Sequence, residues 1–134
     1  MDWFIKALKQ YADFKGRARR KEYWMFILFY VLILLLAVGL DSLIGSTFSF
    51  DVPFGFLFLI SFLGLIIPCL AVLVRRLHDM GKSGWFYFVR FIPLVGPIML
   101  LVWLCTDSEF GTNKWGENPK GLGNTTAIDQ IGIE

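Results

Sequence analysis

The side chains that could do chemistry gather in one short polar stretch, residues 75–85, between two long apolar runs. His78, the single histidine of the chain, is followed directly by Asp79. An imidazole titrates near neutral pH and a carboxylate can orient it, so the pair has the composition of a general acid–base site. Neighbouring residues do not automatically face each other, however, and no nucleophile accompanies them. We favour a structural role, in which Asp79 caps the turn or pairs with an arginine, and assign no catalytic residue.

The sequence pattern predicts neither a metal site nor another cofactor. One His and one Asp fall short of a metal site unless donors come from elsewhere in the chain. The two cysteines, Cys69 and Cys105, lie in or beside apolar runs and have no partner at metal-site spacing. We interpret them as small hydrophobic residues without a redox role.

Residues 81–83, Gly-Lys-Ser, are similar to the end of a phosphate-binding loop. The Walker pattern requires a glycine five residues before Gly81, and the chain has Arg76 at that place. The match therefore fails. We expect instead that Gly81 and Gly84 allow a tight reversal of the chain and that Lys82 faces lipid headgroup phosphates.

Cationic side chains form two clusters, each beside an apolar run. Residues 1–22 carry seven Lys or Arg against three acids, and Arg75 and Arg76 follow the second run. A nucleic-acid site is disfavoured because no aromatic stacking platform or recognition fold accompanies these cations. We predict that they bind membrane lipids, anionic lipids among them, or a partner protein. The predicted lipid- or partner-binding residues are Arg17, Arg19, Arg20, Arg75, Arg76, His78, Asp79 and Lys82.

Three apolar runs are long enough to predict transmembrane helices. They cover residues 23–40, 54–74 and 85–104. Two prolines, Pro93 and Pro97, predict a break or kink in the third run. Arg90 is the only charged residue of that run, and we expect it to face the helix bundle or to snorkel to the interface.

These elements predict an all-α membrane protein. Residues 2–14 alternate aromatic and charged side chains at helical spacing, which predicts an amphipathic interfacial helix before the three spans. We expect one polytopic domain over residues 1–120 and a flexible, irregular tail over residues 121–134. The positive-inside rule puts the N-terminus and residues 75–84 in the cytoplasm. An odd number of spans then puts the C-terminal tail on the opposite, periplasmic side.

Three blocks of sequence carry a resemblance to a known family. They are GRARRKEYW from Gly16, RRLHD from Arg75 with GKSGW from Gly81, and GTNKWGENP from Gly111. In this order they resemble the bacterial inner-membrane family catalogued as domain of unknown function 805, over nearly the whole chain. The resemblance implies a small polytopic protein of the bacterial inner membrane with no established activity. Arg90 departs from the family pattern, which is usually apolar there.

Three classes of function stay open at this point. We favour a non-enzymatic membrane protein that binds lipid headgroups or a partner through a basic cytoplasmic surface. The second class is an oligomeric small channel or transporter, suggested by Arg90 and the prolines of the third run. The third is a lipid-modifying enzyme that uses His78 and Asp79. Partners other than lipid would be a second copy of the chain or another membrane protein.

Overall fold

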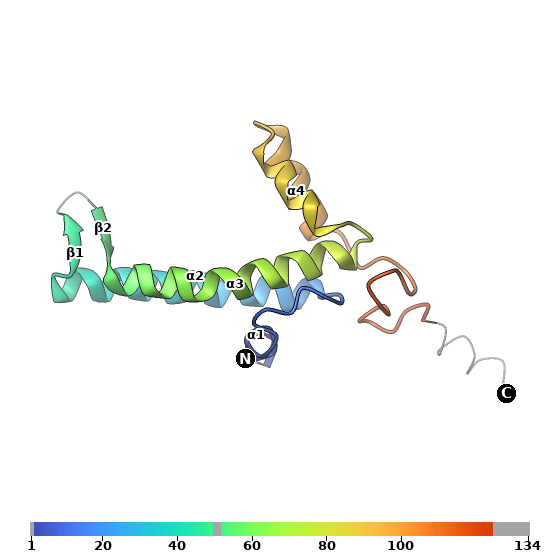
Figure 1. Cartoon of the computed structure of the whole chain (residues 1–134), viewed down its shortest axis with the longest axis horizontal. Helices are drawn as coiled ribbons and strands as arrows, with labels where there is room; N and C mark the ends of the chain where they lie inside the picture. Colours follow the sequence, from blue (N-terminus) through green and yellow to red (C-terminus); the bar gives the residue numbers. More distant parts are fainter. Residues whose placement is uncertain (1, 50–51, 125–134) are drawn as a thin grey trace.

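Two long antiparallel helices form the body of the protein in the computed structural model, which describes residues 2–49 and 52–124 (Figure 1). These helices are α2 (Arg20–Ile44) and α3 (Phe56–Asp79). Both are long and apolar enough to cross a membrane, yet only 11% and 22% of their apolar windows are buried. A core helix of a soluble protein would bury most of that surface, so the exposure indicates a lipid environment. The mostly helical architecture and two apolar helices of spanning length are therefore confirmed.

Both helices extend beyond the predicted spans. α2 continues to Ile44 and ends where Gly45 adopts a left-handed conformation, with φ of 74°. α3 continues to Asp79, so residues 75–79 are helical and not part of the predicted polar loop. The loop is only residues 80–83, and its reversal uses Gly81 at φ of 70°. The charged residues led us to end the predicted second span too early, at residue 74. The helix continues through them because their side chains are paired inside the protein.

A β-hairpin joins the far ends of the two helices. Strands β1 (Thr47–Ser49) and β2 (Val52–Gly55) pair in antiparallel register. Asp41, which is fully buried, accepts hydrogen bonds from the backbone N–H groups of Leu57 (3.1 Å) and Phe58 (2.8 Å). The last turn of α2 thus supplies the N-terminal cap of α3. Gly55 is required at this point, because a Cβ there would lie 2.6 Å from the Asp41 carboxyl carbon.

The third apolar run does not form one helix, which corrects the prediction of a span over residues 85–104. It forms the 3₁₀ helix η1 (Gly84–Phe91) and the 11-residue helix α4 (Val95–Cys105). Leu94, at φ of 64°, reverses the chain between them, directly after Pro93. Both ends of this segment return to α3, since Gly84 packs on Val74 and the Leu104 carbonyl accepts from Arg76 Nε at 3.3 Å. η1 and α4 therefore form a hairpin that projects from the long helix pair (Figure 1).

The N-terminal helix α1 (Asp2–Lys9) packs across the long pair and is shorter than the predicted helix over residues 2–14. The Phe4 ring lies 5.5 Å from Phe26 and 5.2 Å from Phe29 on α2. After it, Tyr11 donates from its hydroxyl to the Gly64 carbonyl of α3 at 2.9 Å. These contacts fix α1 and the following linker, residues 10–19, against the pair.

The tail follows α4 as irregular chain, and residues 106–124 contain only one isolated bridge, between Asn113 and Gly116. The part of the predicted flexible tail beyond residue 124 lies outside the described residues. The described part of the tail lies against the linker and the end of α3, next to the start of α2 (Figure 1). The described part of the tail is thus in contact with the N-terminal basic segment, an arrangement that differs from the expected position of the tail on the opposite side.

Candidate functional site

The last turn of α3 carries three charged residues that are all buried. Arg75, Arg76 and Asp79 are 2%, 0% and 0% exposed. Helical spacing places Arg76 beside Asp79, and their side chains form an ion pair with Arg76 Nη1 2.6 Å from Asp79 Oδ2. A buried charge is very costly unless it is paired and hydrogen-bonded. The burial of this group therefore depends on the partners that other segments supply.

Asp79 receives donors from three separate segments. Arg17 Nε, from the linker, donates to Oδ1 at 3.0 Å, and Arg76 binds Oδ2. The Ser108 hydroxyl, from the tail, also donates to Oδ2 at 2.6 Å. One carboxylate thus joins the linker, α3 and the tail.

Arg17 extends the same network into the tail. Its Nη1 donates to the Gly111 carbonyl at 2.7 Å, and its Nη2 donates to the carbonyls of Glu109 at 2.6 Å and Asp79 at 3.1 Å. The planar guanidinium, with five N–H donors, is suited to bridging a carboxylate and several carbonyls. The tail is therefore fastened to the end of α3 by a residue of the N-terminal segment.

A second buried carboxylate, that of Glu22 on α2, pairs with Arg75. Glu22 is fully buried and forms ion pairs with Lys6 of α1 at 2.8 Å and with Arg75 at 3.2 Å. Arg75 also donates to the side-chain oxygen of Gln10. Two buried atoms, Glu22 Oε1 and Arg75 Nη2, lack a hydrogen bond in the described part of the chain. Glu22 and Arg75 join α1, α2 and α3 in the way that Asp79 joins α3 and the tail.

The His78 ring faces away from this network. It stacks on Trp115 of the tail with ring centroids 4.5 Å apart and an angle of 12° between the planes. Its Nδ1 lies 3.3 Å from the Gly16 carbonyl. The Asp79 oxygens are meanwhile occupied by Arg17, Arg76 and Ser108, so the two neighbours do not form the acid–base pair that their sequence suggested.

Cations that are not buried line a small groove at the start of α2. Its volume is about 270 Å³, and it is lined by Arg19, Arg20, Lys21 and Lys120. Arg19 donates to the Pro119 carbonyl of the tail, and Arg20 donates to the Cys105 carbonyl at the end of α4. Lys120 pairs with Asp107, and this hydrogen bond, together with one from the Ser108 N–H, lowers the pKa of the Asp107 carboxyl. Asp107 therefore stays ionised at neutral pH and offsets one of the four positive charges. We call this feature the cationic groove.

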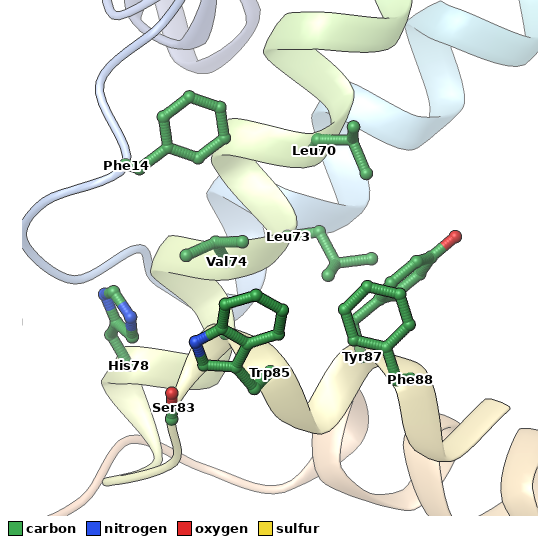
Figure 2. Close-up of a pocket in the computed structure, with 10 residues that line it drawn as sticks. Phe14, Leu70, Leu73, Val74, His78, Ser83, Trp85, Tyr87 and Phe88 are labelled. Carbon is green, nitrogen blue, oxygen red and sulfur yellow. The ribbon is translucent and has the colours of Figure 1, made fainter.

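An apolar pocket of about 600 Å³ opens on the other side of α3, between the linker and η1. Figure 2 shows its walls, with Phe14 from the linker, Leu70, Leu73 and Val74 from α3, and Trp85 and Phe88 from η1. His78 lies at its margin, and Ser83 also lines it. We call this feature the apolar pocket.

Comparison with known proteins places this arrangement in a family. The family model described as "Protein of unknown function (DUF805)" matches residues 11–117. The chain belongs to the DUF805 family. It is 38% identical to inner membrane protein YhaI of Escherichia coli K12 over 120 residues, which are 90% of this chain and 97% of that protein. It is 39% identical to inner membrane protein YhaH of the same strain, with 90% and 98% covered. No solved structure matches the chain.

The family assignment and the two apolar helices together identify an inner-membrane protein. The region matched by the DUF805 model contains every segment of the buried network except Lys6 and Gln10. The three sequence blocks that carry the family resemblance are thus brought together at one end of the long helix pair, although the chain separates them by tens of residues.

The residues predicted to bind lipid or a partner do not form one site in this DUF805 protein, and His78 lies at the apolar pocket. Arg17, Arg75, Arg76 and Asp79 are buried in the network, whereas Arg19 and Arg20 line the cationic groove. Lys82 lies elsewhere, with its ammonium 4.5 Å from the ring centre of Trp103 and 5.3 Å from that of Phe86. Arg90 is exposed on η1 and donates to the Tyr87 hydroxyl.

Sequence reasoning missed several residues of the site, notably Ser108, Trp115 and Lys120. Glu22 could be expected to pair with the arginines, because it is the single acid of the basic stretch 15–22, directly before the first span. Trp115 lies in one of the family blocks, the stretch from Gly111 to Pro119. Ser108 and Lys120 stand in irregular chain without periodicity, and nothing in their spacing pointed to the end of α3.

Proposed function

We propose that this DUF805 protein binds anionic lipid headgroups at the cytoplasmic membrane surface through the cationic groove. The observation that carries the proposal is the gathering of four cationic side chains, from the start of α2 and from the tail, around one groove of about 270 Å³. The arginines of the buried network are not accessible to a headgroup, since each is buried and already faces a carboxylate. Headgroup recognition therefore falls to Arg19, Arg20, Lys21 and Lys120.

The orientation that the proposal requires follows from the charges at the two ends of the helix pair. The hairpin end, residues 41–55, contains Asp41 and Asp51 and no Lys or Arg. The opposite end gathers the basic N-terminal segment and the tail. Cytoplasmic loops of membrane proteins carry the excess of Lys and Arg, which favours a cytoplasmic position for the groove and for the N-terminal segment and described tail around it.

The chemistry of the groove suits a phosphate. Arginine offers two parallel N–H donors to phosphate oxygens, and lysine adds a compact charge. The groove also lies at the N-terminus of the 25-residue α2, where the partial positive charge of the helix adds to the attraction. The apolar face of α2 begins immediately after it, so a lipid whose phosphate sits in the groove can keep its chains against the helix.

Binding of a short-chain phosphatidylglycerol to the protein in uncharged detergent tests this proposal. Replacing Arg20 and Lys21 together by Gln should weaken binding about thirtyfold, since each cation near an anionic headgroup contributes on the order of 1 kcal/mol. The matched control replaces Lys9 and Lys15, two exposed cations outside the groove, by Gln and should change affinity less than about threefold. Equal losses in the two double variants would show that the attraction is diffuse and would overturn the groove.

The geometry gives less support to the two other classes of function, a lipid-modifying enzyme and a channel or transporter. A lipid-modifying enzyme would require His78 and Asp79 to act together, and their side chains have separate partners. A channel or transporter would require a polar path, and Arg90 lies on the outer surface of η1 with Tyr87. Flux measurements in liposomes with and without the purified protein would test a transport role directly.

A further inference from the structure

The apolar pocket has the size and lining of a small-molecule site. Its volume of about 600 Å³ lies within the range of roughly 300–1,000 Å³ that is usual for ligand pockets. Among the described residues that line it there is no Lys, Arg, Asp or Glu. A phosphate or a carboxylate would therefore be buried there without a counter-charge, which is costly. The pocket selects an uncharged ligand and differs in this respect from the cationic groove.

His78 gives the pocket one polar contact of defined character. The residue is only 8% exposed. Because a carbonyl oxygen can only accept, the contact of Nδ1 with the Gly16 carbonyl requires the hydrogen to be on Nδ1. In the neutral ring Nε2 then presents a lone pair, and within the described part of the chain the hydrogen bond of the ring is the one at Nδ1. An acceptor at the margin of the pocket that no protein group occupies favours a ligand that brings a hydroxyl group.

Aromatic side chains define the rest of the ligand. Phe14, Trp85, Tyr87 and Phe88 line the pocket from two sides of α3 (Figure 2). Aromatic walls favour a flat ring in offset or edge contact over a simple chain. The α3 wall of Leu70, Leu73 and Val74 is aliphatic and suits a branched hydrocarbon tail. A neutral ring with hydroxyl groups and a long apolar tail also partitions into membranes, from which the pocket can be reached.

We infer that the apolar pocket binds the hydroquinone head of a prenylated lipid, with one hydroxyl donating to Nε2 of His78. Ser83, which also lines the pocket, offers a second polar group for the head. The aromatic walls hold the ring and the aliphatic wall holds the first part of the tail. The inference concerns binding alone and does not depend on the cationic groove.

A paired-ligand measurement tests the hydrogen bond. The full chain is placed in nanodiscs of uncharged lipid at pH 8, without oxygen. It is titrated with decyl-hydroquinone and with the dimethyl ether of this compound, which has no hydroxyl hydrogen to donate. Titration of empty nanodiscs corrects for partitioning of each ligand into the lipid. The native protein should bind the hydroquinone about tenfold more tightly than the ether, as expected for one hydrogen bond to an acceptor in an apolar pocket. His78→Phe keeps a ring against Trp115 but has no acceptor, so this preference should disappear. Equal affinity for both ligands in the native protein, or an unchanged preference in His78→Phe, would overturn the inference.

Two further comparisons keep the test decisive if His78→Phe does not fold. Leu70→Trp fills the pocket and should abolish saturable hydroquinone binding, whereas Leu63→Trp, on the lipid-facing surface of α3, should leave it unchanged. Decanol, which has a hydroxyl and a chain but no ring, should bind at least tenfold more weakly than the hydroquinone. Binding that survives Leu70→Trp, or decanol that binds equally well, would contradict the assignment. The Arg20 and Lys21 double variant should keep full hydroquinone binding, which separates this site from the proposed headgroup site.

Discussion

Arg17 and Asp79 are 62 positions apart in sequence, yet Arg17 Nε lies 3.0 Å from Asp79 Oδ1 and both side chains are almost fully buried. Through this contact the N-terminal linker, the end of α3 and the tail become one polar unit at one end of the long helix pair. The unit explains why so many charges are tolerated beside apolar helices, because the buried arginines face carboxylates. It also presents the exposed cations of the groove on a fixed support.

Asp79→Asn should destabilise the protein strongly. The change removes the carboxylate that Arg17 and Arg76 share, and breaking a buried ion pair from one side typically costs about 3–5 kcal/mol. Thermal unfolding in mild detergent measures the effect. The matched control is Asp107→Asn, which removes an exposed carboxylate that also pairs with a cation and should cost at most about 0.5 kcal/mol. Similar shifts in both variants would show that the network carries no special stability.

Arg17→Lys should loosen the tail without unfolding the helix pair. Lysine keeps the charge but cannot reach Asp79 and the carbonyls of Glu109 and Gly111 at the same time. Hydrogen exchange of backbone amides in residues 109–119 should become at least about tenfold faster, as a loss of about 1.4 kcal/mol of local stability implies. Exchange in the middle of α2 should stay unchanged. Faster exchange throughout the chain would mean that Arg17 supports the whole fold and not the tail in particular.

Asp41→Ala should weaken the opposite end of the helix pair. Alanine removes the acceptor for the Leu57 and Phe58 amides at the start of α3 and for the Ser46 hydroxyl. The melting temperature should fall clearly, and these two amides should exchange faster. Ser42→Ala, an exposed change one residue away, serves as control and should leave both readouts unaltered. Protection of the two amides that survives in Asp41→Ala would contradict the capping role.

The sequence predicted the parts of the fold that depend on uninterrupted hydrophobicity. The runs of α2 and α3 are free of charge for long enough that only a span or a buried core accounts for them. The run from Trp85 to Leu104 satisfied the same criterion and still folded as a hairpin. A count of apolar residues does not register that Pro93 and the left-handed Leu94 turn the chain back, or that Gly96 lets α4 approach the Val89 carbonyl closely.

The sequence indicated which types of residue make up the candidate site, but not how these residues are arranged in space. Basic residues beside a span usually lie in water or among headgroups, so Arg75 and Arg76 were expected at the surface. Their burial depends on Glu22 and Asp79, together with the return of the tail, and these contacts join segments far apart in the chain. Local periodicity carries no information on such contacts, and the tail has no periodicity at all.

The central claim is that the N-terminal segment and the tail lie on one side of the membrane, held together at the end of α3. Paired reporter fusions in living cells test it most directly: one reporter after Glu134 and one inserted after Gly45, at the hairpin end. The account predicts that a fluorescent reporter active only in the cytoplasm works after Glu134, and that alkaline phosphatase, active only in the periplasm, works after Gly45. Phosphatase activity from the fusion after Glu134 would contradict it, because the third run would then cross the membrane and the tail could not reach Arg17.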